Sequence, residues 1–195
     1  EFYRQEYTSL KKEIAALCKD TYVHFLDCTK IEFNGVRILG LTLWTDYLAR
    51  QSIPQDLAMI YANKGLVDHS LIQYDTGTGL RKFKPEDALA IHQKERAWLT
   101  AELSKSCSGK TVVVTHHGPN PICDHPDYPN SDIASAFYSD LTDIIEQHDI
   151  FLWVCGHSHS NVDEIIYGTR IYSNQAGYPG ENVAGFNPEF VLEVL

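Results

Sequence analysis

The sequence predicts an α/β fold with mixed β-sheets, and two observations carry this prediction. In the second half of the chain, short apolar segments of strand length alternate with segments of helical periodicity. Elsewhere, two pairs of alternating segments are joined by short turns, which is the pattern of β-hairpins. Alternating strands and helices favour parallel pairing and hairpins add antiparallel pairing, so we expect mixed rather than purely parallel sheets.

The first quarter of the chain is expected to hold a helix, a short strand and a hairpin. Apolar residues recur at helical spacing through the first dozen positions, and residues 22–26 have the composition of a short strand. The dipeptide Asn34-Gly35 lies between two alternating segments and predicts the hairpin, because both residues of its turn need a positive φ. We expect the second hairpin strand to continue as far as residues 45–46.

Residues 48–84 interrupt this pattern and predict a helical insertion within one domain, not a separate domain. Pro54 can begin a short helix there and Gly65 can end it. Pro85 then begins a long helix, whose first turn carries acidic residues that complement the helix dipole.

The second half provides the alternation of strands and helices. Residues 111–115 form an apolar, β-branched segment of the kind buried on both faces of a sheet. A helix is expected across residues 133–145, followed by a buried strand at residues 151–155. A hairpin with its turn at Gly168-Thr169 and a last strand at residues 191–194 complete the prediction.

Composition and charge limit the classes of partner. The chain of 195 residues, 44% of them hydrophobic, can bury the core of one domain. No segment has the run of about 18 apolar residues that would span a bilayer, so we expect no membrane partner. The formal net charge of −10 makes nucleic acid an unlikely ligand, because the chain repels a phosphate backbone. A small phosphorylated substrate is still compatible, since bound divalent cations reverse the local field.

Cysteine usage bears on the compartment. The five cysteines are odd in number and have no Cys-x-x-Cys spacing. In a chain of this length they indicate reduced thiols, so we expect a cytoplasmic protein.

Histidine-rich sequences follow two of the predicted buried strands. Thr-His-His-Gly-Pro at residues 115–119 directly follows one strand, and Gly-His-Ser-His at residues 156–159 directly follows another. Open α/β sheets bind their ligands at the carboxyl ends of strands. Neutral imidazole is the commonest metal ligand in proteins. The two sequences therefore predict a metal site at this edge of the sheet.

The same two sequences resemble blocks of the calcineurin-like metallophosphoesterases. Residues 112–119 are similar to the fourth block of that family, and residues 156–159 match its Gly-His-x-His block. Residues 1–3 resemble the tail of the Gly-Asn-His-Glu block, while residues 41–46 and 174–179 resemble a small bacterial-type branch. The similarity thus extends over the whole chain.

The resemblance implies a fold and a set of ligands. The family fold is a four-layer αββα arrangement, in which two mixed sheets pack face to face with helices outside. His116 and His157 would bind one metal ion and His159 the second, the ions being divalent Mn, Fe or Zn. His117 would contact substrate or orient a ligand, although it could replace His116 as the ligand.

The chain also departs from the family pattern. The Asp-x-His and Gly-Asp-x-x-Asp blocks, and the Asn and His of Gly-Asn-His, would have to precede Glu1. We therefore interpret residues 1–195 as a single metallophosphoesterase domain that lacks its N-terminal portion and is incomplete for activity. This interpretation predicts an unpaired central edge in the sheet beside residues 111–115.

The leading functional prediction is hydrolysis of a phosphate mono- or diester by a binuclear metal centre. The substrate would be a small phosphorylated molecule or a phosphoprotein, and residues 48–84 would lie beside the site and influence substrate choice. Two alternatives stay open: a non-catalytic protein-binding scaffold, and a mononuclear zinc hydrolase with three histidine ligands. Metal stoichiometry distinguishes them, at about two, none or one ion per complete protein.

Overall fold

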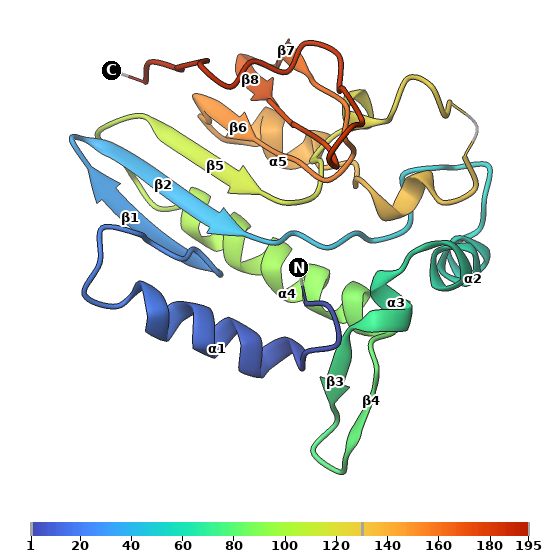
Figure 1. Cartoon of the computed structure of the whole chain (residues 1–195). Helices are drawn as coiled ribbons and strands as arrows, with labels where there is room; N and C mark the ends of the chain where they lie inside the picture. The colour runs from blue at the N-terminus through green and yellow to red at the C-terminus, as the bar shows by residue number, and fades with distance from the viewer. Residues whose placement is uncertain (1, 130, 195) are drawn as a thin grey trace.

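The computed structural model describes residues 2–129 and 131–194 of the chain (Figure 1). Its strands are β1 (Thr29–Phe33), β2 (Val36–Leu41), β3 (Gln73–Asp75), β4 (Leu80–Lys82), β5 (Thr111–Thr115), β6 (Leu152–Val154), β7 (Asp163–Ile166) and β8 (Thr169–Tyr172). Its α-helices are α1 (Tyr7–Cys18), α2 (Gln55–Gly65), α3 (Asp68–Leu71), α4 (Pro85–Leu103) and α5 (Thr142–Gln147), with 3₁₀ turns at Pro121–Cys123 and Ala134–Ala136. None of the helices in the described part of the chain is long and apolar enough to cross a membrane.

A six-stranded mixed sheet in the order β1-β2-β5-β6-β8-β7 organises the fold. The four inner strands β2, β5, β6 and β8 pair in parallel, and β1 and β7 add antiparallel pairs at the two edges. The predicted α/β class with mixed sheets is therefore confirmed. The second sheet is smaller than the family pattern implied, because β3 and β4 form a two-stranded ribbon of only three residues each.

Both predicted hairpins are present. Asn34 (φ 48°) and Gly35 (φ 77°) turn between β1 and β2. Tyr167 (φ 48°) and Gly168 (φ 85°) turn between β7 and β8, one residue earlier than predicted. Both turns have two successive residues with positive φ, the requirement from which the first hairpin was predicted.

The predicted helix across residues 133–145 is wrong. The chain forms a 3₁₀ turn and the short helix α5, separated by a segment that bonds to the loop after β5. The Gly118 N–H donates to the Phe137 carbonyl at 3.1 Å, and the Ser139 N–H donates to the Gly118 carbonyl at 3.0 Å. These long-range bonds satisfy backbone groups that a continuous helix would have bonded internally.

Three strand predictions also need correction. Residues 22–26 and 191–194 are not strands: neither segment is paired with a strand of the sheets in the described chain. β2 ends at Leu41, short of the predicted residues 45–46. Leu43 has a positive φ of 52°, which extended strand backbone does not allow.

The predicted unpaired central edge beside β5 is wrong as well. β5 pairs with β2 on one side and with β6 on the other, so both of its backbone edges are bonded within the described chain. The edges of this sheet are β1 and β7.

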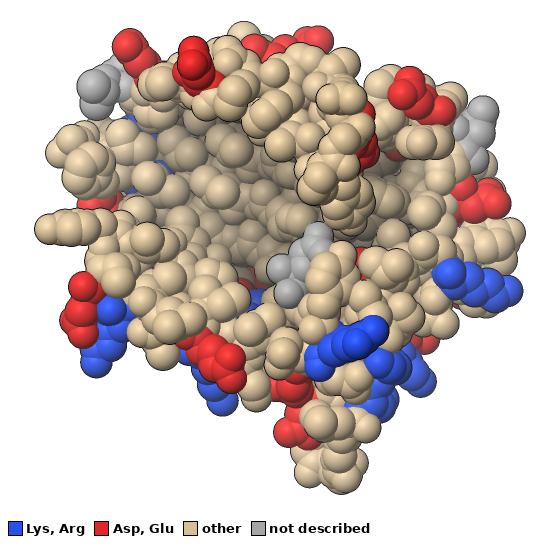
Figure 2. All heavy atoms as spheres, viewed as in Figure 1, with Lys and Arg blue, Asp and Glu red and all other residues tan. Residues whose placement is uncertain are grey.

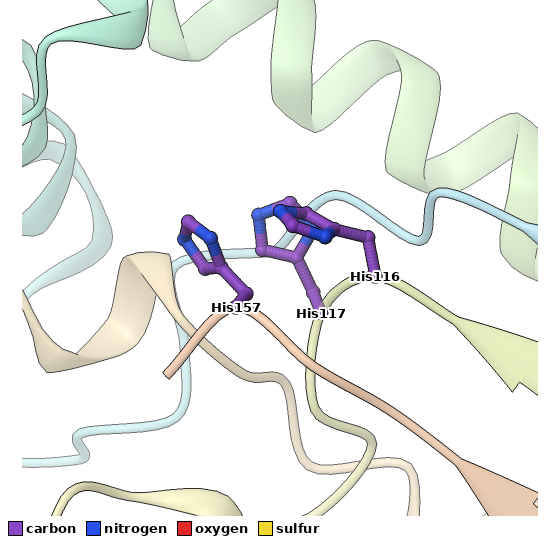
Figure 3. A group of neighbouring side chains, drawn as sticks. All are labelled: His116, His117 and His157. Carbon is purple, nitrogen blue, oxygen red and sulfur yellow. The ribbon is translucent and has the colours of Figure 1, made fainter. Parts of the chain in front are cut away.

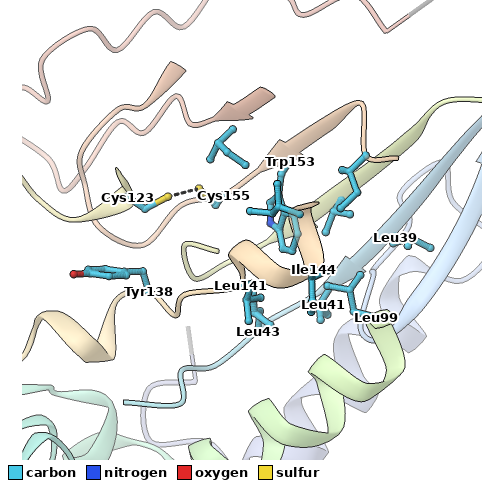
Figure 4. Close-up of a cluster of buried hydrophobic side chains, with 14 of the residues drawn as sticks. Leu39, Leu41, Leu43, Leu99, Cys123, Tyr138, Leu141, Ile144, Trp153 and Cys155 are labelled. Atoms are coloured by element: carbon cyan, nitrogen blue, oxygen red, sulfur yellow. Dashed lines mark hydrogen bonds between the residues drawn. The ribbon is translucent and has the colours of Figure 1, made fainter. Parts of the chain in front are cut away.

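Two clusters of buried side chains form the core. The larger cluster lies between the sheet, α4 and α5, and includes Leu39, Leu99 and Trp153 (Figure 4). In it the Cys123 and Cys155 sulfur atoms lie 3.7 Å apart. The smaller cluster joins α1, α2 and α4 through stacked and tilted aromatic rings, among them Tyr7, Trp44 and Phe83.

A buried carboxyl group makes the fold sensitive to pH. Glu95 lies on the inner face of α4, where its carboxylate accepts the Trp44 N–H at 3.3 Å. Burial raises the pKa of Glu95 to about 7, and the nearby Lys11 offsets part of that effect. Ionising this side chain therefore costs more in the folded protein than in the unfolded chain.

We expect stability to fall as the pH rises from about 4.5 to about 7, because the folded state binds the Glu95 proton more tightly than the unfolded state. At one pKa unit per 1.36 kcal/mol, the loss is up to about 3 kcal/mol. Glu95→Gln should flatten this part of the profile, measured by urea unfolding between pH 4.5 and 8. Glu86→Gln, in the exposed first turn of the same helix, is the control and should leave the slope unchanged. An unaltered slope in Glu95→Gln would contradict the prediction.

Candidate metal centre

Three histidines converge at the carboxyl ends of β5 and β6 (Figure 3). His116 and His117 follow β5, and His157 follows β6, its parallel neighbour in the sheet. The centroid of the His157 ring lies 4.6 Å from that of the His116 ring and 4.4 Å from that of the His117 ring. One nitrogen from each ring lies within 4.8 Å of the others, which is a spacing that allows one metal ion to be held.

Backbone hydrogen bonds from neighbouring loops fix this arrangement. The N–H groups of His116 and His117 both donate to the Thr42 carbonyl, at 3.1 and 3.2 Å. The Gly156 N–H donates to the His116 carbonyl at 3.0 Å, which ties the loop after β6 to the loop after β5. His157 has a φ of 70°, a left-handed conformation that few non-glycine residues adopt. The loop backbone thus turns sharply enough to direct this side chain at the other two.

His117 is the buried member of the group, with 2% of its surface exposed. Its Nδ1 lies 3.3 Å from the Thr42 carbonyl, so Nδ1 carries the hydrogen and Nε2 holds the free lone pair. The ring packs against Trp44, with centroids 5.1 Å apart. Burial lowers the pKa of His117 well below its usual value, with further contributions from His157 and His116. The side chain is therefore a neutral imidazole, the form that binds metals.

His157 has a buried ring nitrogen that a metal ion could satisfy. Its ring stacks on Phe137, with centroids 4.7 Å apart, and its Nε2 is buried without a hydrogen-bond partner among the residues that the structure describes. Burial lowers the pKa of His157 to about 3, and the charges of His116 and His159 add to the effect. A buried polar atom without a partner is costly, and coordination of a cation would satisfy it. The residues present therefore fit a metal ion.

His159, predicted as a ligand, lies outside the three-histidine group. Its Nδ1 is 2.8 Å from the Glu181 carboxylate, and its backbone N–H donates to the Gln175 side chain at 2.9 Å. It is close enough to His157 to lower the pKa of that residue. The structure thus brings together His116, His117 and His157, and places His159 beside them.

A cavity of about 1040 Å³ opens over the site. His116, His157 and His159 line it, as do residues 65–68 from the segment predicted as an insertion. No Lys or Arg is among the described residues that line this cavity. The viewed face is hollowed at its centre, and its Lys and Arg side chains lie mostly below the hollow (Figure 2). The described lining residues therefore supply no lysine or arginine charge to a phosphate in this cavity.

Several residues that shape the site were not found from the sequence. Thr42 and Trp44 were predicted as the end of a strand within a segment that resembles the bacterial-type branch, without a role in the site. In the structure the Thr42 carbonyl accepts hydrogen bonds from both neighbouring histidines. Phe137 falls within the helix predicted across residues 133–145, and in the structure it stacks on His157 instead. No sequence pattern pointed to Glu181, because its contact with His159 joins residues that are 22 positions apart in the chain.

Comparison with known proteins places this fold. No family model matches the chain. The uncharacterized protein L509 of Acanthamoeba polyphaga mimivirus is 28% identical over 171 residues, covering 84% of this chain and 57% of that protein. The crystal structure of the phosphopantetheinyl hydrolase PptH from Mycobacterium tuberculosis superposes with a TM-score of 0.63 at 20% identity, over 88% of this chain. The chain has the metallophosphoesterase fold.

The metallophosphoesterase fold of this chain has its histidines at strand ends, and the chain covers only part of the similar proteins. The histidine sequences that resembled the family blocks lie at strand ends of the same sheet, as the buried strands before them predicted. The chain spans 57% of L509 and 61% of the PptH chain, so it corresponds to little more than half of either protein.

Proposed function

We propose that the protein is a metal-dependent phosphoesterase that hydrolyses a phosphate mono- or diester in the cavity over the histidine site. The observation that carries this proposal is the buried, unpartnered His157 Nε2 beside two further imidazoles, at the carboxyl ends of neighbouring parallel strands. The metallophosphoesterase fold gives independent support. The lack of Lys and Arg among the described cavity residues is a third argument, because it leaves the substrate charge to be met by cations.

His116, His117 and His157 would hold one divalent cation, and His159 would contribute to a second. Imidazole ligands favour Mn, Fe or Zn over Mg, whose preferred ligands are oxygen atoms. Bound divalent metal supplies Lewis acidity and activates water for in-line attack on phosphorus. Burial within this chain keeps His117 and His157 neutral, and the lining residues shape the cavity in which the phosphate ester would bind.

The substrate we propose is a small phosphorylated molecule or a phosphoprotein. The cavity volume is at the upper end of the range for small-molecule sites, so an organic group larger than the phosphate can enter. PptH is named as a phosphopantetheinyl hydrolase, and a phosphopantetheinyl ester is therefore one candidate to assay. Residues 65–68 lie against the same cavity, and we propose that they influence substrate choice.

A second candidate is a mononuclear hydrolase with three histidine ligands. The compact group of His116, His117 and His157 favours it, since one nitrogen of each ring lies within 4.8 Å of the others. Three protein ligands with an open fourth position are typical of catalytic zinc.

The deciding experiment combines metal content with turnover in the full-length protein. We expect about two divalent ions per molecule, with hydrolysis of p-nitrophenyl phosphate or bis(p-nitrophenyl) phosphate that is lost on chelation. One ion per molecule with the same turnover would favour the mononuclear hydrolase. Absence of both metal and turnover would contradict the proposal and leave the protein-binding scaffold.

A further inference from the structure

The C-terminal strap, defined as residues 174–190, forms one wall of the cavity. Residues 175–178 and 181–184 of the strap line it. In Figure 1 the strap is the red segment that follows β8. It contains no helix or strand, so side-chain contacts contribute much of what holds it in position.

Two of these contacts are made by asparagines away from the histidine site. The Asn174 side chain donates to the Asn187 carbonyl at 2.8 Å and accepts the Asn187 N–H at 3.0 Å, which closes the strap on itself. The Asn161 side chain donates to the Ala184 carbonyl at 3.0 Å, which fixes the strap to the loop before β7.

Two further strap residues reach the site. The Gln175 side chain accepts the His159 N–H and donates to the Ser160 carbonyl, while Glu181 contacts the His159 ring. The Glu181 carboxylate lies 2.8 Å from His159 Nδ1, and it also accepts the Tyr178 N–H at 2.6 Å. Gly177 leaves room for this carboxylate, because a Cβ there would lie 2.6 Å from Glu181 Oε2. The Tyr178 ring meets the His159 ring edge-on, with centroids 4.6 Å apart. Glu181 and Tyr178 therefore hold His159 from the strap side.

The hydrogen bond determines which nitrogen of His159 is free. The Glu181 carboxylate accepts the backbone N–H of Tyr178, so the same oxygen is an acceptor where it meets His159. The His159 nitrogen that faces this acceptor, Nδ1, therefore carries a hydrogen. The lone pair is then on Nε2, which is available to a metal ion.

We propose that Glu181 is a positioning residue for His159 and that it couples metal ligation to closure of the C-terminal strap. The proposal rests on the proposed function, because it takes His159 as a ligand of the second ion. Histidine ligands in metal sites commonly donate their other N–H to a carboxylate, which fixes the tautomer and raises the basicity of the ligating nitrogen. Here that carboxylate is on a segment without regular secondary structure rather than on a strand or helix.

Reciprocity gives the proposal a second consequence. If the Glu181 contact strengthens metal binding at His159, then metal binding must strengthen the Glu181 contact by the same factor. Metal should therefore hold the strap against the cavity, and its loss should loosen the wall formed by residues 175–184.

The first test is metal affinity in the full-length protein, measured by calorimetry with Mn²⁺ and Zn²⁺. We expect Glu181→Ala to weaken one of the bound ions by roughly 10–100-fold. Glu181→Gln should recover much of this loss, because the amide oxygen still accepts the Nδ1–H of His159. Glu189→Gln removes a charge from the same strap without touching His159 and should bind metal as the wild type does. Unchanged affinity in Glu181→Ala would overturn the proposal.

A loosened strap could by itself weaken metal binding. The variant Asn174→Ala distinguishes this effect from loss of the contact between Glu181 and His159. That variant removes both bonds to Asn187 and leaves the Glu181 contact in place. We expect its metal affinity to stay within about 3-fold of the wild type, because the orientation of His159 is kept. A loss as large as that of Glu181→Ala would show that Glu181 acts only by holding the strap, and would overturn the positioning role.

Hydrogen exchange tests the coupling. Saturating metal should slow exchange of the backbone N–H groups of residues 178–184 in the wild type, and much less in Glu181→Ala. Equal slowing in both proteins would overturn the coupling. These outcomes differ from failure of the proposed function, in which the wild type itself would bind no divalent ion and release no phosphate.

Discussion

Replacing His157 by alanine is expected to remove most of the bound metal and nearly all phosphoesterase turnover from the full-length protein. The change deletes an imidazole whose Nε2 is buried and has no hydrogen-bond partner among the described residues. Loss of a side chain that only supports a ligand costs roughly 10–100-fold in metal affinity or activity, so loss of a ligand should cost more than about 100-fold. Metal content by elemental analysis and turnover of p-nitrophenyl phosphate measure the two effects.

His125→Ala is the matched control, because His125 lines the same cavity but lies outside the three-histidine group. It should retain its metal and change turnover only modestly. Full metal content in His157→Ala would contradict the assignment of the site. Unchanged turnover in His157→Ala would contradict the proposed function.

His117→Ala decides between the two roles considered for that residue. The sequence favoured a group that orients a ligand or contacts substrate, whereas the structure places the ring within the compact group. Metal loss equal to that of His157→Ala would make His117 a ligand. A smaller metal loss with a larger fall in turnover would support the orienting role.

The location of the site was predictable because it follows from strand topology. Side chains directly after two parallel neighbours are brought together by the pairing of the strands themselves. Apolar β-branched residues marked β5, and the apolar run before Gly156 marked β6. No distant contact had to be known for this step.

The details that were missed depend on contacts between distant parts of the chain. Residues 133–145 have helical periodicity, but the Gly118 N–H donates to the Phe137 carbonyl and the Ser139 N–H donates to the Gly118 carbonyl, in place of the bonds of a helix. The pairing of His159 with Glu181 depends on how the C-terminal strap crosses the site, which periodicity does not encode. Local patterns predict local structure, and tertiary hydrogen bonds override them where a loop has to be held.

The hydrogen bonds of Trp153 link the core to the metal site. Trp153 is fully buried in β6, and its indole N–H donates to the Thr115 hydroxyl at 3.0 Å. That hydroxyl in turn donates to the His117 carbonyl at 2.7 Å. The position of the His117 loop therefore depends on the packing of a core side chain as well as on its own sequence.

Trp153→Ala is expected to lower the free energy of unfolding by about 3–5 kcal/mol, because it removes the largest fully buried side chain and leaves a cavity in the sheet. Trp153→Phe keeps an aromatic ring but loses the bond to Thr115, and should cost about 1–3 kcal/mol. Urea unfolding at constant pH measures both.

Phe151→Ala is the control, since Phe151 precedes β6 and is 37% exposed, and it should lower the free energy of unfolding by less than either Trp153 variant. If Trp153→Ala cost no more than Phe151→Ala, Trp153 would not be central to the core. If Trp153→Phe left metal affinity unchanged while lowering stability, the link through Thr115 would be structural only.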